Sequence, residues 1–236
     1  MTNFYKVLTP YYDEIFPAND KQISFLFSCF PAASTLLDVG AGTGNTAIAL
    51  AKAGYILTAA EPEQSMTVKI KEKSDRDQLH IKVMPNSMQQ ILQLNATFDG
   101  IYCIGNTLAH LDNFNEICTF LQAAYDMLNE QGKLVIQTVN FENVLRHQNY
   151  SFPLIQKDTF TFTRKYEPLD HKIRFTTILE DHSDTHSNTI LLYPVTKTQL
   201  QNELLNCGFH SISVYGDYGK SPYNIESPAL VIIASK

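Results

Sequence analysis

Short apolar runs alternate with amphipathic stretches over the first 140 residues of the chain. Each run has five to seven residues, the length of a buried strand. The runs cover residues 35–39, 55–60, 79–84, 98–104 and 133–139. Helices are predicted between them, from composition or periodic apolar spacing, at residues 46–53, 64–76 and 114–128. Strands that alternate with helices in this way predict an α/β fold built on a parallel sheet.

The pattern changes after residue 140. Residues 159–166 and 172–179 alternate apolar and polar side chains, as strands do, across a turn near residues 168–170. These runs predict an antiparallel β insertion, which can border a binding site, form a dimer contact or only extend the core. Further strands are predicted at residues 189–193, 210–215 and 229–235, and a helix at residues 199–207.

A tyrosine-rich amphipathic segment precedes the first strand, over residues 4–17. Its apolar and aromatic side chains fall near one face, and they are Tyr5, Leu8, Tyr11, Tyr12 and Ile15. A second helix is predicted at residues 21–30, where Pro31 stops it.

The first strand ends in an acid and a glycine-rich turn. Asp38 precedes Gly40, Gly42 and Gly44, which stand at every second position, and helix-forming residues follow at once. Glycines let the backbone turn tightly and let a ligand approach it closely. The next helix then presents free N–H groups to the crevice beyond the strand, where open α/β sheets bind ligands.

The spacing of these glycines separates two classes of nucleotide ligand. Dinucleotide-binding turns favour G-x-G-x-x-G, whereas this chain has G-x-G-x-G followed by Asn45. The run from Asp38 to Gly44 resembles the first motif of class I S-adenosylmethionine (SAM)-dependent methyltransferases. The resemblance implies SAM as co-substrate, S-adenosylhomocysteine (SAH) as product, and no metal. An NAD(P)-dependent oxidoreductase and a SAM-binding protein that has lost catalysis are the alternatives.

A second acid stands where a nucleoside sugar would be bound. Glu61, followed by Pro62, ends the second strand, about 20 residues beyond the first glycine. A carboxylate at this point can accept hydrogen bonds from both ribose hydroxyls. The alternative is a carboxylate exposed at a strand end.

The resemblance implies further contacts to SAM. Tyr12 belongs to a segment that forms a lid over the SAM pocket in this family, and packing on the domain is its alternative role. Met66 corresponds to a residue that packs on the adenine face. Ser87 stands where the family commonly has an Asp for the adenine amino group, and the backbone of Met88 would meet the ring. The implied cofactor-binding residues are Tyr12, Asp38, Gly40, Ala41, Gly42, Glu61, Pro62, Met66, Ser87, Met88, Gly105 and Asn106.

The run G-N-T-L-A-H-L, which starts at Gly105, resembles glycine/sarcosine N-methyltransferases and their small-molecule relatives, including sugar-amine enzymes. In the glycine enzymes the Asn of this run, here Asn106, helps hold the substrate carboxylate. Those enzymes also carry an Arg soon after the fifth strand, and this chain has Val139 at that position. We therefore expect a small-molecule N or O acceptor and doubt free glycine. His110 is the expected catalytic base, and packing is its alternative role. Candidate acceptor contacts in the insertion, unless they only pack or lie at the surface, are Tyr150, Arg164, Tyr166 and Arg174.

The same resemblance implies a Rossmann-like sheet of seven mostly parallel strands, in the order 3-2-1-4-5-7-6. The last strand would be antiparallel, and helices would cover both faces. Residues 1–140 and 193–236 would form the SAM-binding domain, with a helical lid over residues 1–30. Residues 141–192 would form the insertion and shape the acceptor pocket. Methyl transfer would be an in-line displacement, for which the enzyme aligns the reacting atoms.

Composition and charge weigh against several other partners. The 236 residues carry a formal charge of −6, and the 18 basic residues form no stripe, which disfavours nucleic acid. No apolar run approaches the roughly 20 residues of a membrane span, and no signal peptide is visible, so we expect a cytoplasmic protein. The four cysteines lie far apart and are expected to be buried free thiols rather than zinc ligands. A homodimer is left open.

Overall fold

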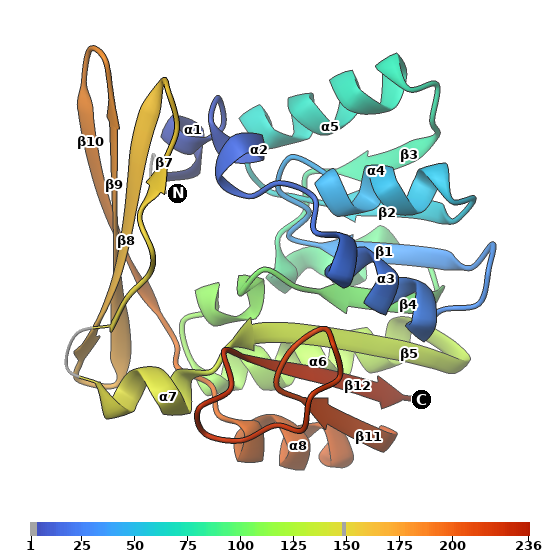
Figure 1. Cartoon of the computed structure of the whole chain (residues 1–236). Coiled ribbons are helices and arrows are strands. Elements are labelled where there is room, and N and C mark those ends of the chain that lie inside the picture. The colour runs from blue at the N-terminus through green and yellow to red at the C-terminus, as the bar shows by residue number, and fades with distance from the viewer. Residues whose placement is uncertain (1–3, 148–149) are drawn as a thin grey trace.

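Seven strands form one mixed sheet (Figure 1). The computed structural model describes residues 4–147 and 150–236. The strands of this sheet are β1 (Thr35–Val39), β2 (Ile56–Ala60), β3 (Ile81–Met84), β4 (Phe98–Cys103), β5 (Leu128–Val139), β11 (His210–Tyr215) and β12 (Ala229–Ser235). Their order is β11-β12-β5-β4-β1-β2-β3, and β12 runs antiparallel to both of its neighbours. This confirms the predicted order 3-2-1-4-5-7-6 with an antiparallel last strand.

Helices cover both faces of the sheet because successive strand side chains point to opposite sides. Leu36 of β1 belongs to one core cluster and Leu37 to the other. One face packs against α3 (Asp20–Cys29), α4 (Asn45–Lys52) and α5 (Gln64–Arg76). The other face packs against the 3₁₀ helix η1 (Met88–Leu94), α6 (Phe114–Met127) and α8 (Lys197–Asn206).

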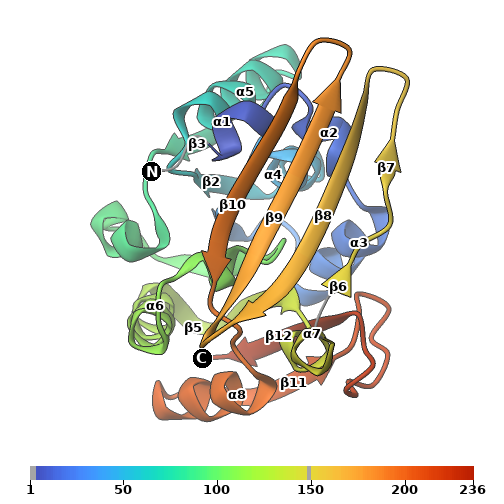
Figure 2. The same cartoon turned by 90° about the vertical axis from the view of Figure 1, so that its left-hand side faces the viewer.

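A second, antiparallel sheet stands opposite the carboxyl ends of the parallel strands (Figures 1 and 2). It contains β6 (Tyr150–Ser151), β7 (Ile155–Gln156), β8 (Phe160–Leu169), β9 (Lys172–Asp181) and β10 (Thr185–Leu192). Its three long strands run in the order β10-β9-β8, and the short β6 and β7 both pair with β8. The predicted antiparallel insertion is therefore confirmed, although its third strand starts earlier than expected. The insertion also begins with a helix, α7 (Phe141–Arg146), rather than a strand.

The inner face of the second sheet is buried by two groups of residues. Its upper part packs on the short helices α1 (Phe4–Leu8) and α2 (Tyr12–Ile15), through Leu8 and Ile15. Its lower part packs on α7 and on the 3₁₀ helix η2 (Thr107–His110). The amphipathic N-terminal segment is thus two helices and not one, broken around Pro10, which cannot donate a backbone hydrogen bond.

Two smaller findings complete the description. All four cysteines are free, as expected, but Cys118 is only partly buried, so its predicted burial was wrong. No helix within the described residues is both long enough and apolar enough to pass through a membrane.

Candidate active site

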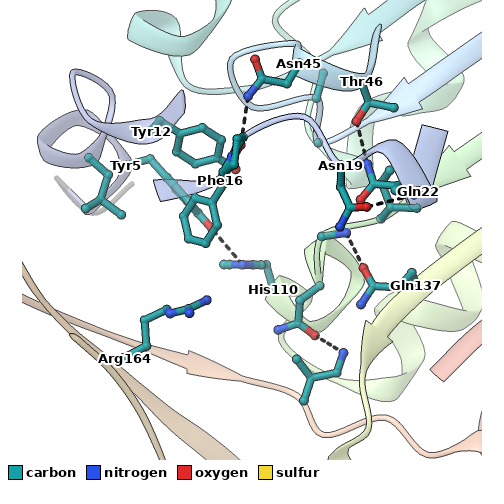
Figure 3. Close-up of a pocket in the computed structure, with 18 of the residues that line it drawn as sticks. Tyr5, Tyr12, Phe16, Asn19, Gln22, Asn45, Thr46, His110, Gln137 and Arg164 are labelled. Carbon is teal, nitrogen blue, oxygen red and sulfur yellow. Dashed lines mark hydrogen bonds between the residues drawn. The ribbon is translucent and has the colours of Figure 1, made fainter. Parts of the chain in front are cut away.

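A cavity of about 530 Å³ separates the carboxyl edge of the large sheet from the second sheet (Figure 3). Its walls come from three parts of the chain. The N-terminal helices contribute Tyr5 and Tyr12, and the strand ends contribute Asp38 and Gly40. The second sheet contributes aromatic side chains of β8 and β9. Segments more than 100 residues apart in the sequence therefore meet around one space.

The glycine-rich turn forms one end of this cavity. Gly40 and Gly42 have φ angles of +74° and +57°, which favour glycine. A Cβ atom on Gly40 would lie 2.3 Å from a methyl carbon of Thr107, and one on Gly42 would lie 3.0 Å from the Tyr12 hydroxyl. The turn is therefore closely covered and has no room for a side chain.

Asp38, at the end of β1, is a buried acid on the cavity wall. It is only 2% exposed, and its Oδ2 atom has no hydrogen-bond partner among the described residues. Burial raises its pKa to about 8, and the charge of Glu61 adds to this effect. The Tyr102 hydroxyl partly offsets this shift. An acid in this state is suited to a cationic ligand group.

Glu61, which follows β2, is 7% exposed and turned toward the glycine-rich turn. Its Oε2 atom accepts a hydrogen bond from the Gly42 backbone N–H at 2.9 Å, and its Oε1 atom accepts one from the Glu63 N–H at 2.9 Å. Burial still raises the pKa of Glu61 to about 7. Two acids with raised pKa values therefore lie at adjacent strand ends.

Tyr12 lies over this turn, and the helix that carries it, α2, is fastened there. The Lys73 ammonium lies 2.6 Å from the Asp13 carboxylate and donates to the Asn45 side chain at 2.7 Å. The Asn45 amide in turn donates to the Phe16 carbonyl at 3.0 Å (Figure 3). These contacts hold α2 to the first turn of α4.

His110 ends η2 and faces the cavity opposite this turn. Its Nε2 atom lies 2.8 Å from the Tyr5 hydroxyl (Figure 3). Burial lowers the pKa of His110 to about 4 and raises the pKa of Tyr5. At neutral pH both groups are therefore uncharged, and the Tyr5 hydroxyl keeps the proton that it can donate to Nε2.

Asn106 and Gly105 shape the wall beside His110. The Asn106 side chain accepts a hydrogen bond from the Val139 N–H at 3.0 Å and donates one to the Tyr166 hydroxyl at 3.2 Å. The Gly105 N–H donates to the Gln137 side chain at 2.7 Å. The amide of Asn106 is thus fixed between the two sheets.

The cavity brings together about half of the residues predicted from the sequence. Those on its wall are Tyr12, Asp38, Gly40, Ala41, Gly105, Asn106 and His110. The remaining predicted residues lie off this wall, and they are Gly42, Glu61, Pro62, Met66, Ser87 and Met88. Met66 is buried, and Ser87 is the N-cap residue of η1, where its N–H donates to the Gln90 side chain at 3.2 Å.

Sequence reasoning missed some of the cavity residues. Tyr5 and Gln137 had no assigned role, although a polar Gln near the carboxyl end of an apolar strand is a signal that could have identified one of them. Of the insertion candidates, Arg164 and Tyr166 line the cavity, whereas Tyr150 and Arg174 are not on its wall.

Comparisons with known proteins relate the chain to methyltransferases. A family model described as a methyltransferase domain matches residues 36–132. The glycine/sarcosine N-methyltransferase of Aphanothece halophytica is 26% identical over 211 residues, covering 86% of this chain and 76% of that protein. The enzyme of the same name from Halorhodospira halochloris is 24% identical over 204 residues, covering 85% and 74%.

Solved structures share the whole fold. A SAM-dependent methyltransferase from Clostridium acetobutylicum superposes with a TM-score of 0.82 at 14% identity, covering 99% of both chains. An amino pentose methyltransferase from Micromonospora echinaspora, solved with SAM bound, superposes with a TM-score of 0.73 at 16% identity, covering 100% of this chain and 97% of that one. The chain is a SAM-dependent methyltransferase.

The residues of this methyltransferase fit SAM on structural grounds. The turn has no room for side chains, and the unpartnered carboxylate oxygen of Asp38 suits the cationic part of the molecule. The comparisons support a small-molecule methyltransferase and do not support an NAD(P)-dependent oxidoreductase. Within the described residues no cluster of metal-ligating side chains is present.

Proposed function

We propose that this methyltransferase transfers a methyl group from SAM to the nitrogen of a small-molecule amine. The observation that carries the proposal is the single cavity that contains both Asp38 and the His110–Tyr5 pair. A buried acid suited to the cofactor and a neutral pair suited to positioning the acceptor would thus share one cavity. The names of the relatives and neighbours support nitrogen as the acceptor atom, since they include glycine/sarcosine and sugar N-methyltransferases.

On the cofactor side, Gly40, Ala41 and Gly42 would present the backbone of the turn. Asp38 would bind the amino group of SAM, and Tyr12 would close over the molecule. Glu61 would bind the ribose hydroxyls, which requires its carboxylate to exchange one backbone partner for the sugar. The adenine would lie among Pro62, Met66, Ser87 and Met88, beyond the cavity as it stands.

On the acceptor side, the chemistry depends on keeping the amine neutral. When bound, SAM supplies an electrophilic methyl group on a positively charged sulfur. The burial that lowers the pKa of His110 to about 4 acts in the same direction on any amine in the cavity, so the amine keeps its lone pair.

His110 and Tyr5 would then orient this amine. The Tyr5 hydroxyl, 2.8 Å from Nε2 of His110, would donate to that nitrogen, and its oxygen would accept an N–H of the acceptor. The remaining N–H bonds and the lone pair are thereby fixed in direction, which is the main requirement of an in-line displacement. Because its pKa is about 4, His110 would position the amine rather than act as its base, and the methylated ammonium product would give its proton to water.

Acceptor profiling tests the proposal. The enzyme would be incubated with labelled SAM and matched pairs of small amines and alcohols, and release of SAH would be measured. We expect turnover with amines. Turnover confined to hydroxyl acceptors would refute nitrogen as the target, and failure to bind SAH in calorimetry would refute the cofactor site.

A further inference from the structure

Arg164 places a cation in the wall of the cavity opposite the cofactor turn. It lies on β8 with Phe162 and Tyr166 on either side, and these three side chains share the inner face because strand side chains alternate. In the neighbouring strand β9, the residue paired with it is Thr177, which also lines the cavity. Figure 3 shows Arg164 reaching from the second sheet toward the residues of the other walls.

The guanidinium group is held by aromatic rings and not by an acid. Its central carbon lies 4.7 Å from the ring centre of Phe152 and 5.8 Å from that of Phe16. Its Nε atom is buried without a hydrogen-bond partner, and no ion pair joins it to an acid within the described residues. Burial disfavours its charged form, yet a guanidinium remains protonated in proteins. The aromatic rings hold this charge in place but do not neutralise it.

The rest of the acceptor side is neutral. The side chains around Arg164 are aromatic or uncharged, and burial keeps His110 neutral. Among the lining residues that the structure describes, no lysine or second arginine accompanies it. One guanidinium balances the single charge of a carboxylate, whereas a phosphate carries more charge than this wall can balance.

We propose that Arg164 binds a carboxylate carried by the methyl acceptor, so that the acceptor is an amino acid with an apolar body. The fork of the guanidinium would accept the carboxylate in two hydrogen bonds, and the neighbouring aromatic rings would cover the apolar part. This inference rests on the proposed amine methylation. It adds a requirement on the acceptor that an amine without an acid does not meet.

Paired probes test this requirement. The probes are a series of amino acids in which the distance between amine and carboxylate increases; 4-(aminomethyl)benzoate is one of them. For each, kcat/KM would be compared with that of the corresponding amide. We expect the wild-type enzyme to use the best carboxylate about tenfold or more better than its amide in kcat/KM, the scale of a hydrogen-bonded charge pair. Arg164→Gln should bring this ratio close to one, and Arg164→Lys should keep part of it.

Arg174→Gln is the matched control. Arg174 lies on the adjacent strand β9, is exposed and is absent from the cavity wall. The Arg174→Gln variant should keep the full ratio of kcat/KM between carboxylate and amide. Calorimetry with SAH should give the same affinity for the wild type and both glutamine variants, and their melting temperatures would report correct folding.

The possible failures are distinguishable. The role of Arg164 would be overturned if the wild type used carboxylate and amide equally well, or if Arg164→Gln left the ratio of their kcat/KM values unchanged. Amine methylation would still stand in both cases. Weaker SAH binding in Arg164→Gln would assign the guanidinium to the cofactor carboxylate instead. If the enzyme used the matching phosphonate better than the carboxylate, the proposed ligand of Arg164 would be a dianion instead of a carboxylate. Absence of turnover with every amine, acidic or not, would refute the proposed function itself.

Discussion

Replacing Glu61 by Gln should make the protein more stable and a worse enzyme. Glu61 accepts hydrogen bonds from two backbone N–H groups, yet burial raises its pKa from 4.5 to about 7. Because the folded pKa is raised, Glu61 contributes stability that is fully present below pH 4.5 and is lost as the pH rises toward 7. Above pH 7 the fold carries a buried negative charge that SAM binding would use.

The size of the effect follows from this pKa. Ionising Glu61 at pH 8 costs the folded state roughly 3 kcal/mol relative to the unfolded chain. Glutamine removes that cost, but its amide nitrogen cannot accept one of the two hydrogen bonds, a loss of about 1 kcal/mol. The net gain of about 2 kcal/mol corresponds to a melting temperature about 4–8 °C higher for a chain of this size. At pH 5 only the unfolded carboxyl is ionised to a large extent, so the cost that glutamine removes falls to about 0.8 kcal/mol. This nearly cancels the lost hydrogen bond, and the melting temperature of the variant should change little at pH 5.

Thermal melting at pH 5 and pH 8, with SAH calorimetry at pH 8, provides the assay. The exposed Glu72, which pairs with Lys69 on α5, supplies the control Glu72→Gln, whose melting temperature should change little at either pH. Glu61→Gln should also bind SAH about tenfold or more weakly at pH 8, because a charged acceptor for the ribose is lost. A variant that melts lower than the wild type at both pH values would refute the reasoning.

Four further predictions concern the turn, the lid and the acceptor side. Gly42→Val should abolish SAH binding in calorimetry, because its φ is +57° and the new side chain would collide with the lid tyrosine; normal affinity would contradict the assigned cradle. Lys73→Met removes the ion pair to Asp13 and should weaken SAH binding about two- to fivefold, whereas Lys69→Met should not. His110→Asn should lower kcat and preserve SAH affinity. Because the pKa of His110 is about 4, the NMR signals of its ring, assigned by comparison with the His110→Asn variant, should not titrate between pH 5.5 and 8. A titration of this ring near pH 6.5 would count against its buried environment.

Most of the fold could be predicted because its signals are local. The strand Thr35–Val39 and the helix Gln64–Arg76 were predicted to the residue. In both, the residues at the two ends clearly mark where the apolar pattern starts and stops. The third strand of the insertion was harder, because its first residues, Thr185–Asn188, are polar and exposed or only partly buried, so they show no alternation of apolar and polar residues. The N-terminal segment has the apolar face of one helix, but Pro10 divides it.

The site was only partly predictable because its contacts are distant in sequence. The glycine-rich turn is a local motif, so its resemblance to the first motif of SAM-dependent methyltransferases could be recognised from Asp38 and its glycines. The Tyr5–His110 pair joins residues 105 positions apart, and Tyr166 meets Asn106 across 60 positions. No local pattern shows which side of a strand will face a cavity closed by another sheet. The acceptor side therefore required the structure.

A crystal structure of the enzyme with SAH bound would test the central claim most directly. We predict that the amino group of SAH lies against Asp38, the two ribose hydroxyls lie against the Glu61 carboxylate, and Tyr12 covers the molecule above Gly42. SAH bound elsewhere on the protein, or bound here with Glu61 still held by both backbone N–H groups and away from the sugar, would contradict it.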